Sequence, residues 1–322
     1  MPMDSKVIRD ALIEQIYNKM LGNDNIFFVS ADFGAPALDK LREKFSDRFI
    51  NVGIAEQNLI NVSAGLALEG FDVYAYAIAP FLTMRAYEQI RTNLSIMSQV
   101  RPVNVNLIGV GAGLSYDVTG PTHHCLEDAC IMRVLPNFVV FSPADYVTAE
   151  SFIDYSLSVK KPKYIRLDGK AQPRIYNDNS RISMDVGFVE LKEGSEVGIV
   201  STGYMTHKAL RVAEALAAHG VNTGVLDVFM LKPVNEVLLN ESLKKYSHIV
   251  TMEESFLNKG SLDTIIADIL RDNNSDKELT RFGFADRYVF DVGNREHLHK
   301  LNGLDEETIV TSIMKKRKKG SL

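Results

Sequence analysis

The amino-acid sequence predicts an α/β fold of two domains, the first built on a parallel sheet with helices on both faces and the second a smaller α/β domain. Short apolar runs of strand length alternate with segments whose apolar residues recur every three or four positions, a pattern typical of parallel strands joined by crossover helices. A chain of 322 residues suits two domains at roughly 150 residues each. The polar stretch 171–185 interrupts the hydrophobic pattern. We therefore expect a first domain at 1–170, a linker at 171–185 and a second, smaller domain at 186–322.

The first domain opens with an amphipathic helix, because apolar residues recur every four positions from Ile8 to Met20, with Ser5 as a possible N-cap and Gly22 as a stop. The apolar runs that follow end in turn residues and predict strands at 25–30, 48–52, 72–78, 102–109, 137–141 and 163–167. The amphipathic segments between them predict helices at 37–45, 57–69, 81–97, 126–134 and 144–159. A glycine-rich loop is expected at 109–120.

The second domain repeats this alternation after residue 186. Strands are predicted at 197–201, 222–227 and 248–253, and helices at 205–219, 235–246 and 261–271. The tail at 315–319 reads K-K-R-K-K. We interpret it as a solvated helix end whose cations complement the helix dipole. The alternative is a binding site for nucleic acid or lipid.

Composition excludes several classes of function. Lys plus Arg number 36 against 41 Asp plus Glu, for a net charge of −5, which disfavours a nucleic-acid-binding surface. The longest apolar stretch, 73–82, is far shorter than the ~20 residues of a membrane span. Residues 1–10 do not resemble a secretory signal. Cys125 and Cys130 are therefore expected as reduced thiols in a cytoplasmic protein.

Candidate site residues follow the predicted strands, because ligands of parallel sheets bind at the carboxyl ends of the strands. They are Asp32, the run 51–57 that contains Glu56, the run 119–124 and Arg166. Glu56 lies among apolar and small residues, where desolvation favours the protonated, proton-donating form of a carboxyl group. The alternative is a first-turn acid that only complements the helix dipole. The residues alone leave this choice open.

His123 and His124 follow a Gly-Pro-Thr turn, and either imidazole is a candidate proton shuttle or substrate ligand. A loop histidine without chemistry is the alternative. The spacing H-H-C-x4-C, which includes Cys125 and Cys130, does not match common zinc patterns, so we predict no metal site on this chain. The glycines of 109–113 do not open a helix directly, which favours a flexible active-site loop over a dinucleotide fingerprint.

Several motifs together resemble the transketolase family. In order they are S-A-D, R-F-I-N-V-G-I-A-E-Q-N, P-F-L-T-M-R-A-Y-E-Q and G-P-T-H-H, at 30–32, 48–58, 80–89 and 120–124. The resemblance continues through D-V-F-M-L-K-P-V, V-T-M-E-E-S and G-N-R-E-H-L, at 227–234, 250–255 and 293–298. It implies a pyrimidine-binding domain for thiamine diphosphate followed by a smaller C-terminal transketolase-like domain.

The resemblance also implies roles for single residues. Glu56 matches the family's catalytic acid, which hydrogen-bonds the aminopyrimidine and activates the cofactor. The resemblance gives cofactor contacts to Asp32, Ile54, Glu56, Phe81, Met84 and Tyr87. His123 matches a histidine that contacts ketose oxygens and transfers protons, and the neighbouring His124 is expected to bind substrate as well. Arg166 matches an arginine that binds a sugar phosphate.

The family's diphosphate-binding domain, with its G-D-G motif and downstream Asn, has no counterpart in this sequence. The resemblance therefore implies a split enzyme that transfers a two-carbon ketol unit between sugars. A separate N-terminal subunit would carry the diphosphate site and its Mg²⁺, in a dimer of heterodimers. Sugar recognition is expected to be altered, because Thr119, Gly111 and Pro36 replace family residues that bind substrate. The alternatives are a 1-deoxyxylulose-5-phosphate synthase-like enzyme, a 2-oxoacid dehydrogenase beta subunit and a noncatalytic regulatory subunit.

Overall fold

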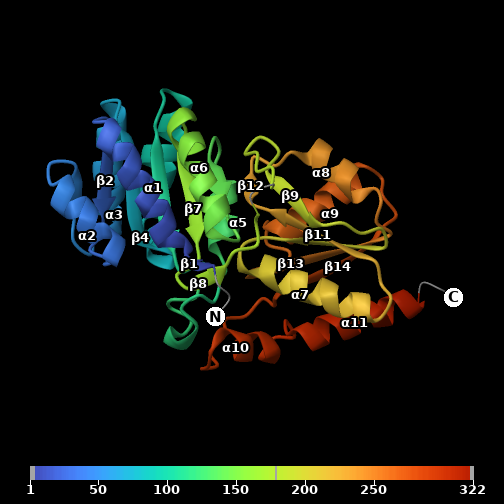
Figure 1. Cartoon of the computed structure of the whole chain (residues 1–322). Coiled ribbons are helices and arrows are strands. Elements are labelled where there is room, and N and C mark those ends of the chain that lie inside the picture. The colour runs from blue at the N-terminus through green and yellow to red at the C-terminus, as the bar shows by residue number, and fades with distance from the viewer. Residues whose placement is uncertain (1–3, 178–179, 320–322) are drawn as a thin grey trace.

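The computed structural model describes residues 4–177 and 180–319. Two sheets lie side by side, one in the blue-to-green N-terminal half of Figure 1 and one in the yellow-to-red C-terminal half. The first has seven strands in the order β12-β6-β7-β5-β4-β2-β3, and the second has five in the order β14-β13-β10-β11-β9. The predicted α/β fold of two domains is confirmed.

The first sheet is parallel except at its β12 edge. Its strands are β2 (Ile26–Ser30), β3 (Phe49–Asn51), β4 (Asp72–Ile78), β5 (Val105–Val110), β6 (Val139–Phe141), β7 (Lys163–Leu167) and β12 (Met230–Lys232). Its principal helices are α1 (Ile8–Gly22), α2 (Pro36–Lys44), α3 (Glu56–Leu68), α5 (Asp128–Val134) and α6 (Tyr146–Ser158). One core contains residues of α1, α2 and α6, and the other contains residues of α3 and α5. Helices therefore cover both faces of the sheet.

The segment predicted as one helix at 81–97 is broken in the structure. It consists of the π-helical turn η1 (Phe81–Arg85), the short α4 (Tyr87–Gln89), a second π-helical stretch η2 (Ile90–Ile96) and the 3₁₀ turn η3 (Met97–Gln99). The hydroxyls of Thr83 and Thr92 donate to the carbonyls of Ala79 and Glu88, four residues back. Such bonds to the carbonyl four residues back often bend a helix, and the periodicity of the sequence does not reveal them.

The second domain contains a mostly parallel sheet with one antiparallel edge, β9. Its strands are β9 (Phe188–Lys192), β10 (Val197–Ser201), β11 (Thr223–Val228), β13 (His248–Phe256) and β14 (Glu278–Phe284). Its helices are α7 (Tyr204–Ala218), α8 (Glu236–Leu243), α9 (Leu262–Asp272), α10 (Arg295–Leu301) and α11 (Glu306–Lys319). The basic tail continues α11, and residues 320–322 lie outside the described part. Among the described residues, no helix is long and apolar enough to cross a membrane.

Two strand pairings differ from a simple division at the linker. Ser5 does not cap α1, because it lies in β1 (Ser5–Val7), which pairs with β8 (Ala171–Pro173). The strand β12 comes from the C-terminal half yet pairs antiparallel with β6 of the first sheet. The predicted linker thus contains a strand, and the domain limits at 170 and 186 stay a prediction.

The stretch after β8 is anchored to both domains. Tyr176 is fully buried, and its backbone amide donates to Asp145 of the first domain at 3.0 Å. The Tyr176 hydroxyl donates to Asp227 on β11 at 2.6 Å. Burial raises the pKa of Asp227 to about 7, against the hydrogen bonds of Tyr176 and Thr206. This contact ties the connection between the domains to the second sheet.

Replacing Tyr176 with phenylalanine is expected to lower the free energy of unfolding by about 1–3 kcal/mol, because the buried Asp227 carboxyl loses a donor. Urea unfolding followed by far-UV circular dichroism measures the change. An unfolding curve that is identical to that of the wild type would show that the connection is not held by this bond.

Candidate functional site

A groove between the two domains is the candidate functional site. Its volume is about 460 Å³, and its lining includes Phe81, Met84, Arg85 and Pro121 from the first domain and Tyr288 and Phe290 from the second. Phe290 is 75% exposed. The carboxyl ends of the parallel strands of the first sheet meet at this edge, so side chains that follow several strands converge there. We call this hollow the interdomain groove.

Glu56 is the first residue of α3, and an ion pair connects it to the groove. Its side chain is buried, at 3% exposure. Arg85, which lines the groove, places Nη1 2.6 Å from the Glu56 Oε2 atom. The same guanidinium lies over the Phe81 ring, 4.8 Å from its centroid. The buried carboxyl group of Glu56 therefore has a cationic partner at the edge of the groove.

His123 lies beside the groove. Its ring is 5.2 Å from that of Phe81 and 6.4 Å from that of Tyr116, edge-on to both. The hydroxyl of Thr122 is 3.1 Å from His123 Nδ1. Gly120 has φ +85° and its carbonyl accepts the His123 amide, so a left-handed turn directs this segment. The structure brings His123 and Phe81 together.

His124 points into the protein instead. It is 4% exposed, and its Nε2 atom lies 3.1 Å from the carbonyl of Asp117. Its Nδ1 atom has no hydrogen-bond partner among the described residues. Its contacts are those of a histidine that holds the loop, so direct contact with a substrate stays a prediction.

The other predicted cofactor residues differ in exposure. Ile54 is exposed and Met84 partly so, while Tyr87 is half-buried and donates its hydroxyl to the Ile131 carbonyl at 2.9 Å. Asp32 has φ +53° and accepts a hydrogen bond from Asn51 at 2.8 Å. The structure therefore places Met84 in the groove, and it places Asp32 beside the turn that leads to Glu56.

Arg166 does not line the interdomain groove. It is 5% exposed; its Nε donates to Asp128 at 2.8 Å and its Nη2 to the carbonyl of Glu254 at 2.9 Å. Through these hydrogen bonds, the Arg166 guanidinium connects Asp128 of the first domain to Glu254 of the second. The sequence placed it correctly at a strand end but could not show that the second domain covers it.

A buried ionic cluster joins the second domain to the glycine-rich loop. Arg295 contacts Asp168 at 2.5 Å and Glu254 at 2.7 Å, and His299 lies 2.6 Å from Glu254. Glu254 also accepts the amide of Leu114 at 3.2 Å. Burial alone would raise the pKa of Glu254, but Arg295 and His299 hold it well below its usual range. The second domain thereby positions the loop that leads to His123.

Sequence reasoning missed Arg85, Tyr288 and Phe290 as groove residues. Arg85 lies inside the motif P-F-L-T-M-R-A-Y-E-Q, one helical turn after Phe81. Residues at this spacing lie on the same face of a helix, so the sequence could have indicated that both side chains line one site. Tyr288 and Phe290 lie in a segment without a helix or strand. Only the three-dimensional packing of the domains shows that they face the first domain.

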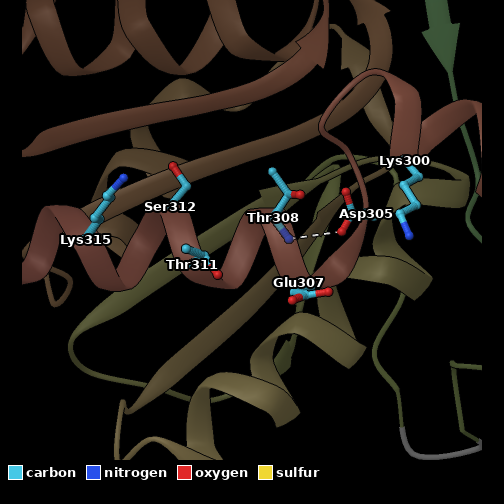
Figure 2. Close-up of a pocket in the computed structure, with 7 residues that line it drawn as sticks. All are labelled: Lys300, Asp305, Glu307, Thr308, Thr311, Ser312 and Lys315. Carbon is cyan, nitrogen blue, oxygen red and sulfur yellow. Dashed lines mark hydrogen bonds between the residues drawn. The ribbon is translucent and has the colours of Figure 1, made fainter.

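A second hollow, of about 530 Å³, lies along α10 and α11. Figure 2 shows its polar lining, in which the Asp305 carboxylate accepts the Thr308 amide. That bond caps the start of α11. The other lining residues are Lys300 on α10 and Glu307, Thr311, Ser312 and Lys315 on α11. We therefore assign no chemistry to this hollow.

The two cysteines are buried free thiols. Burial raises the pKa of Cys130 to about 11 and that of Cys125 well above its usual value. Both therefore stay protonated at neutral pH. Within 4–177 and 180–319, no group of three or more His, Cys, Asp or Glu side chains has the arrangement of a metal site.

Comparison with known proteins identifies the class of this fold and site. The family descriptions "Transketolase, pyrimidine binding domain" and "Transketolase, C-terminal domain" match residues 5–172 and 188–309. The chain therefore has the two-domain architecture of the part of a thiamine-diphosphate enzyme that binds the aminopyrimidine. It belongs to the transketolase family.

Several relatives are themselves subunits of about this size. An apulose-4-phosphate transketolase subunit of Actinobacillus succinogenes is 30% identical over 94% of this chain and 96% of its own length. The 6-deoxy-6-sulfo-D-fructose transketolase subunit SqwH of a Clostridium species is 30% identical over 94% of this chain and 92% of its own length. A solved structure described as a split gene transketolase, an inactive beta4 tetramer, is 32% identical with a TM-score of 0.85, covering 96% of this chain and 97% of that one. This chain is accordingly a transketolase-like transferase subunit.

Proposed function

We propose that this chain supplies the aminopyrimidine half of a thiamine-diphosphate site and transfers a two-carbon ketol unit between sugars. The proposal is supported mainly by the position of Glu56. This side chain is buried at the start of α3 and forms an ion pair with Arg85, which lines a groove together with Phe81 and Met84. An apolar, ring-sized wall beside a carboxyl group suits the aminopyrimidine, a flat ring with a polar nitrogen edge. When bound, the cofactor supplies the carbanion chemistry.

Each groove residue has a proposed part in this function. Phe81 and Met84 pack on the ring of the cofactor, the latter through its thioether. Glu56 holds a proton at the ring nitrogen, and His123, beside Phe81, binds ketose oxygens and moves protons between them and solvent. Tyr288 and Phe290 line the groove from the second domain and offer it two further aromatic side chains.

We further propose that the diphosphate and its Mg²⁺ are held by a separately encoded N-terminal subunit. The size of the subunit relatives supports this division, because they match this chain almost end to end. The complex is proposed to be a dimer of heterodimers in the cytoplasm. Arg166 stays a candidate phosphate contact only if the domain boundary opens, because its guanidinium is buried against Asp128.

Reconstitution with the candidate partner encoded beside this chain tests the function. The complex, with thiamine diphosphate and Mg²⁺, is supplied with a ketose phosphate or with pyruvate, each with an aldose phosphate acceptor. Ketol transfer from the ketose alone is the expected result. Formation of a 1-deoxyketose from pyruvate would favour a 1-deoxyxylulose-5-phosphate synthase-like enzyme, and consumption of pyruvate without that product would favour a 2-oxoacid dehydrogenase beta subunit. Cofactor binding without turnover of either substrate would favour a regulatory subunit.

A further inference from the structure

Arg85 has two contacts that both concern the proposed cofactor site. Its Nη1 atom binds the Glu56 carboxylate at 2.6 Å, and its guanidinium lies over the face of Phe81. These are the carboxyl group and the aromatic face that the proposed function gives to the aminopyrimidine. Arg85 therefore contacts the same two side chains, Glu56 and Phe81, that the aminopyrimidine would contact.

The two partners of this ion pair differ in their exposure to solvent. The side chain of Arg85 is 48% exposed, whereas that of Glu56 is 4% exposed. A rotation of Arg85 toward solvent would therefore hydrate the cation fully. The same movement would leave the Glu56 carboxylate buried without a partner, a state that is unfavourable unless the group takes up a proton or binds another donor.

Within the described part of the chain, no other charged group of the neighbouring elements bonds to Glu56. The helix α3 packs against β2, β4, β5, η1, α4 and η2. Their charged and titratable side chains are Asp72, Tyr74, Tyr76, Arg85, Tyr87, Glu88 and Arg91. Asp72 is bound by Lys160 and Glu88 by Arg91, and the hydroxyls of Tyr74 and Tyr87 bond to Ser156 and the Ile131 carbonyl. The Tyr76 hydroxyl is buried, and burial raises its pKa well above its usual value, so it stays neutral.

We propose that Arg85 competes with the aminopyrimidine for Glu56, so that cofactor binding exchanges an ion pair for a protonated carboxyl group. The inference rests on the proposed function. In the exchange, the guanidinium–carboxylate hydrogen bond breaks and Arg85 moves into solvent with its charge unchanged. Glu56 takes one proton from water or buffer, and its new O–H donates to the ring nitrogen. Arg85 is thus a positioning residue that sets the protonation state of Glu56.

The exchange has a consequence for pH dependence. Because one proton is taken up from solvent, the affinity for thiamine diphosphate should fall about tenfold per pH unit wherever Glu56 is ionised before binding. Without the arginine, burial favours the neutral form of a carboxyl group. The variant Arg85→Gln should therefore take up less than one proton and bind the cofactor more tightly at pH 8.

Calorimetry on the complex of this chain with its partner tests the exchange. Thiamine diphosphate with Mg²⁺ is titrated at pH 6–9 in buffers of different ionisation enthalpy, which yields both the dissociation constant and the number of protons taken up. The wild type should take up about one proton near pH 8. Arg85→Lys, which keeps a cation, and Arg91→Gln, which removes a cation that pairs with Glu88, should both behave as the wild type.

Proton uptake near zero in the wild-type complex would overturn the inference without reference to any variant. Equal proton uptake and equal pH dependence in the wild type and Arg85→Gln would overturn it as well. In both cases thiamine diphosphate still binds, so the proposed function survives. A wild-type complex that binds no thiamine diphosphate would contradict the proposed function itself, and the inference would fall with it.

Discussion

The variant Glu56→Gln is expected to lower kcat for ketol transfer by a factor on the order of 10²–10⁴, because an amide cannot exchange a proton with the ring nitrogen. The side chain keeps its size at a position that is 3% exposed, so folding should change little. Steady-state kinetics of the reconstituted complex measure the effect.

The matched control is Glu88→Gln. Glu88 is exposed and pairs with Arg91 at 3.8 Å on the same face of the chain, so its loss should leave kcat unchanged. A Glu56→Gln complex that retains wild-type kcat would remove Glu56 from the chemistry. Equal losses in both variants would indicate a general structural defect instead.

The variant Arg295→Met is expected to have the largest effect on stability, about 3–5 kcal/mol of unfolding free energy. It leaves the Asp168 and Glu254 carboxylates buried at the domain boundary without their principal cation. Urea unfolding measures the loss. The control, Arg271→Met, removes an exposed arginine that pairs with Asp268 on the same helix, and such pairs contribute little. Equal effects of the two substitutions would contradict the account of the buried cluster.

The same cluster predicts a pH dependence of stability. The pKa of Glu254 is held well below its usual range by Arg295 and His299 despite burial. Its contribution is therefore present above the pKa of an unfolded glutamate, about 4.3, and is lost as the pH falls toward the folded value. Between about pH 5 and pH 3 the wild type should lose stability more steeply than Arg295→Met, as thermal unfolding across this range will show. Parallel pH profiles would exclude Glu254 as the source.

The local pattern of the sequence predicted most of the parallel core. Apolar runs located β2, β4 and β7 with little error, because a strand buried on both faces is a continuous hydrophobic segment. Pairings that join distant segments were not predictable in this way. The edge strand β12 pairs with β6 across the domain division, and nothing within Met230–Lys232 specifies that partner.

The candidate site was predictable as a set of residues but less so as an arrangement. Glu56, Phe81 and His123 were identified from motifs, and the structure places Phe81 beside His123 and links it to Glu56 through Arg85. Glu56 forms its ion pair with Arg85, 29 positions later in the chain. Arg166 was expected at an open strand end, but the second domain covers it through Glu254. Local sequence could not show either contact, because both depend on tertiary packing.

The central claim is that this chain holds only the aminopyrimidine half of a thiamine-diphosphate site. The most direct measurement is calorimetric titration of the purified chain with thiamine diphosphate and Mg²⁺, alone and together with the partner encoded beside it. The account predicts tight binding only with the partner, and loss of that binding with Glu56→Ala. Tight binding by the chain alone would contradict it, because the diphosphate would then have a complete site within this chain.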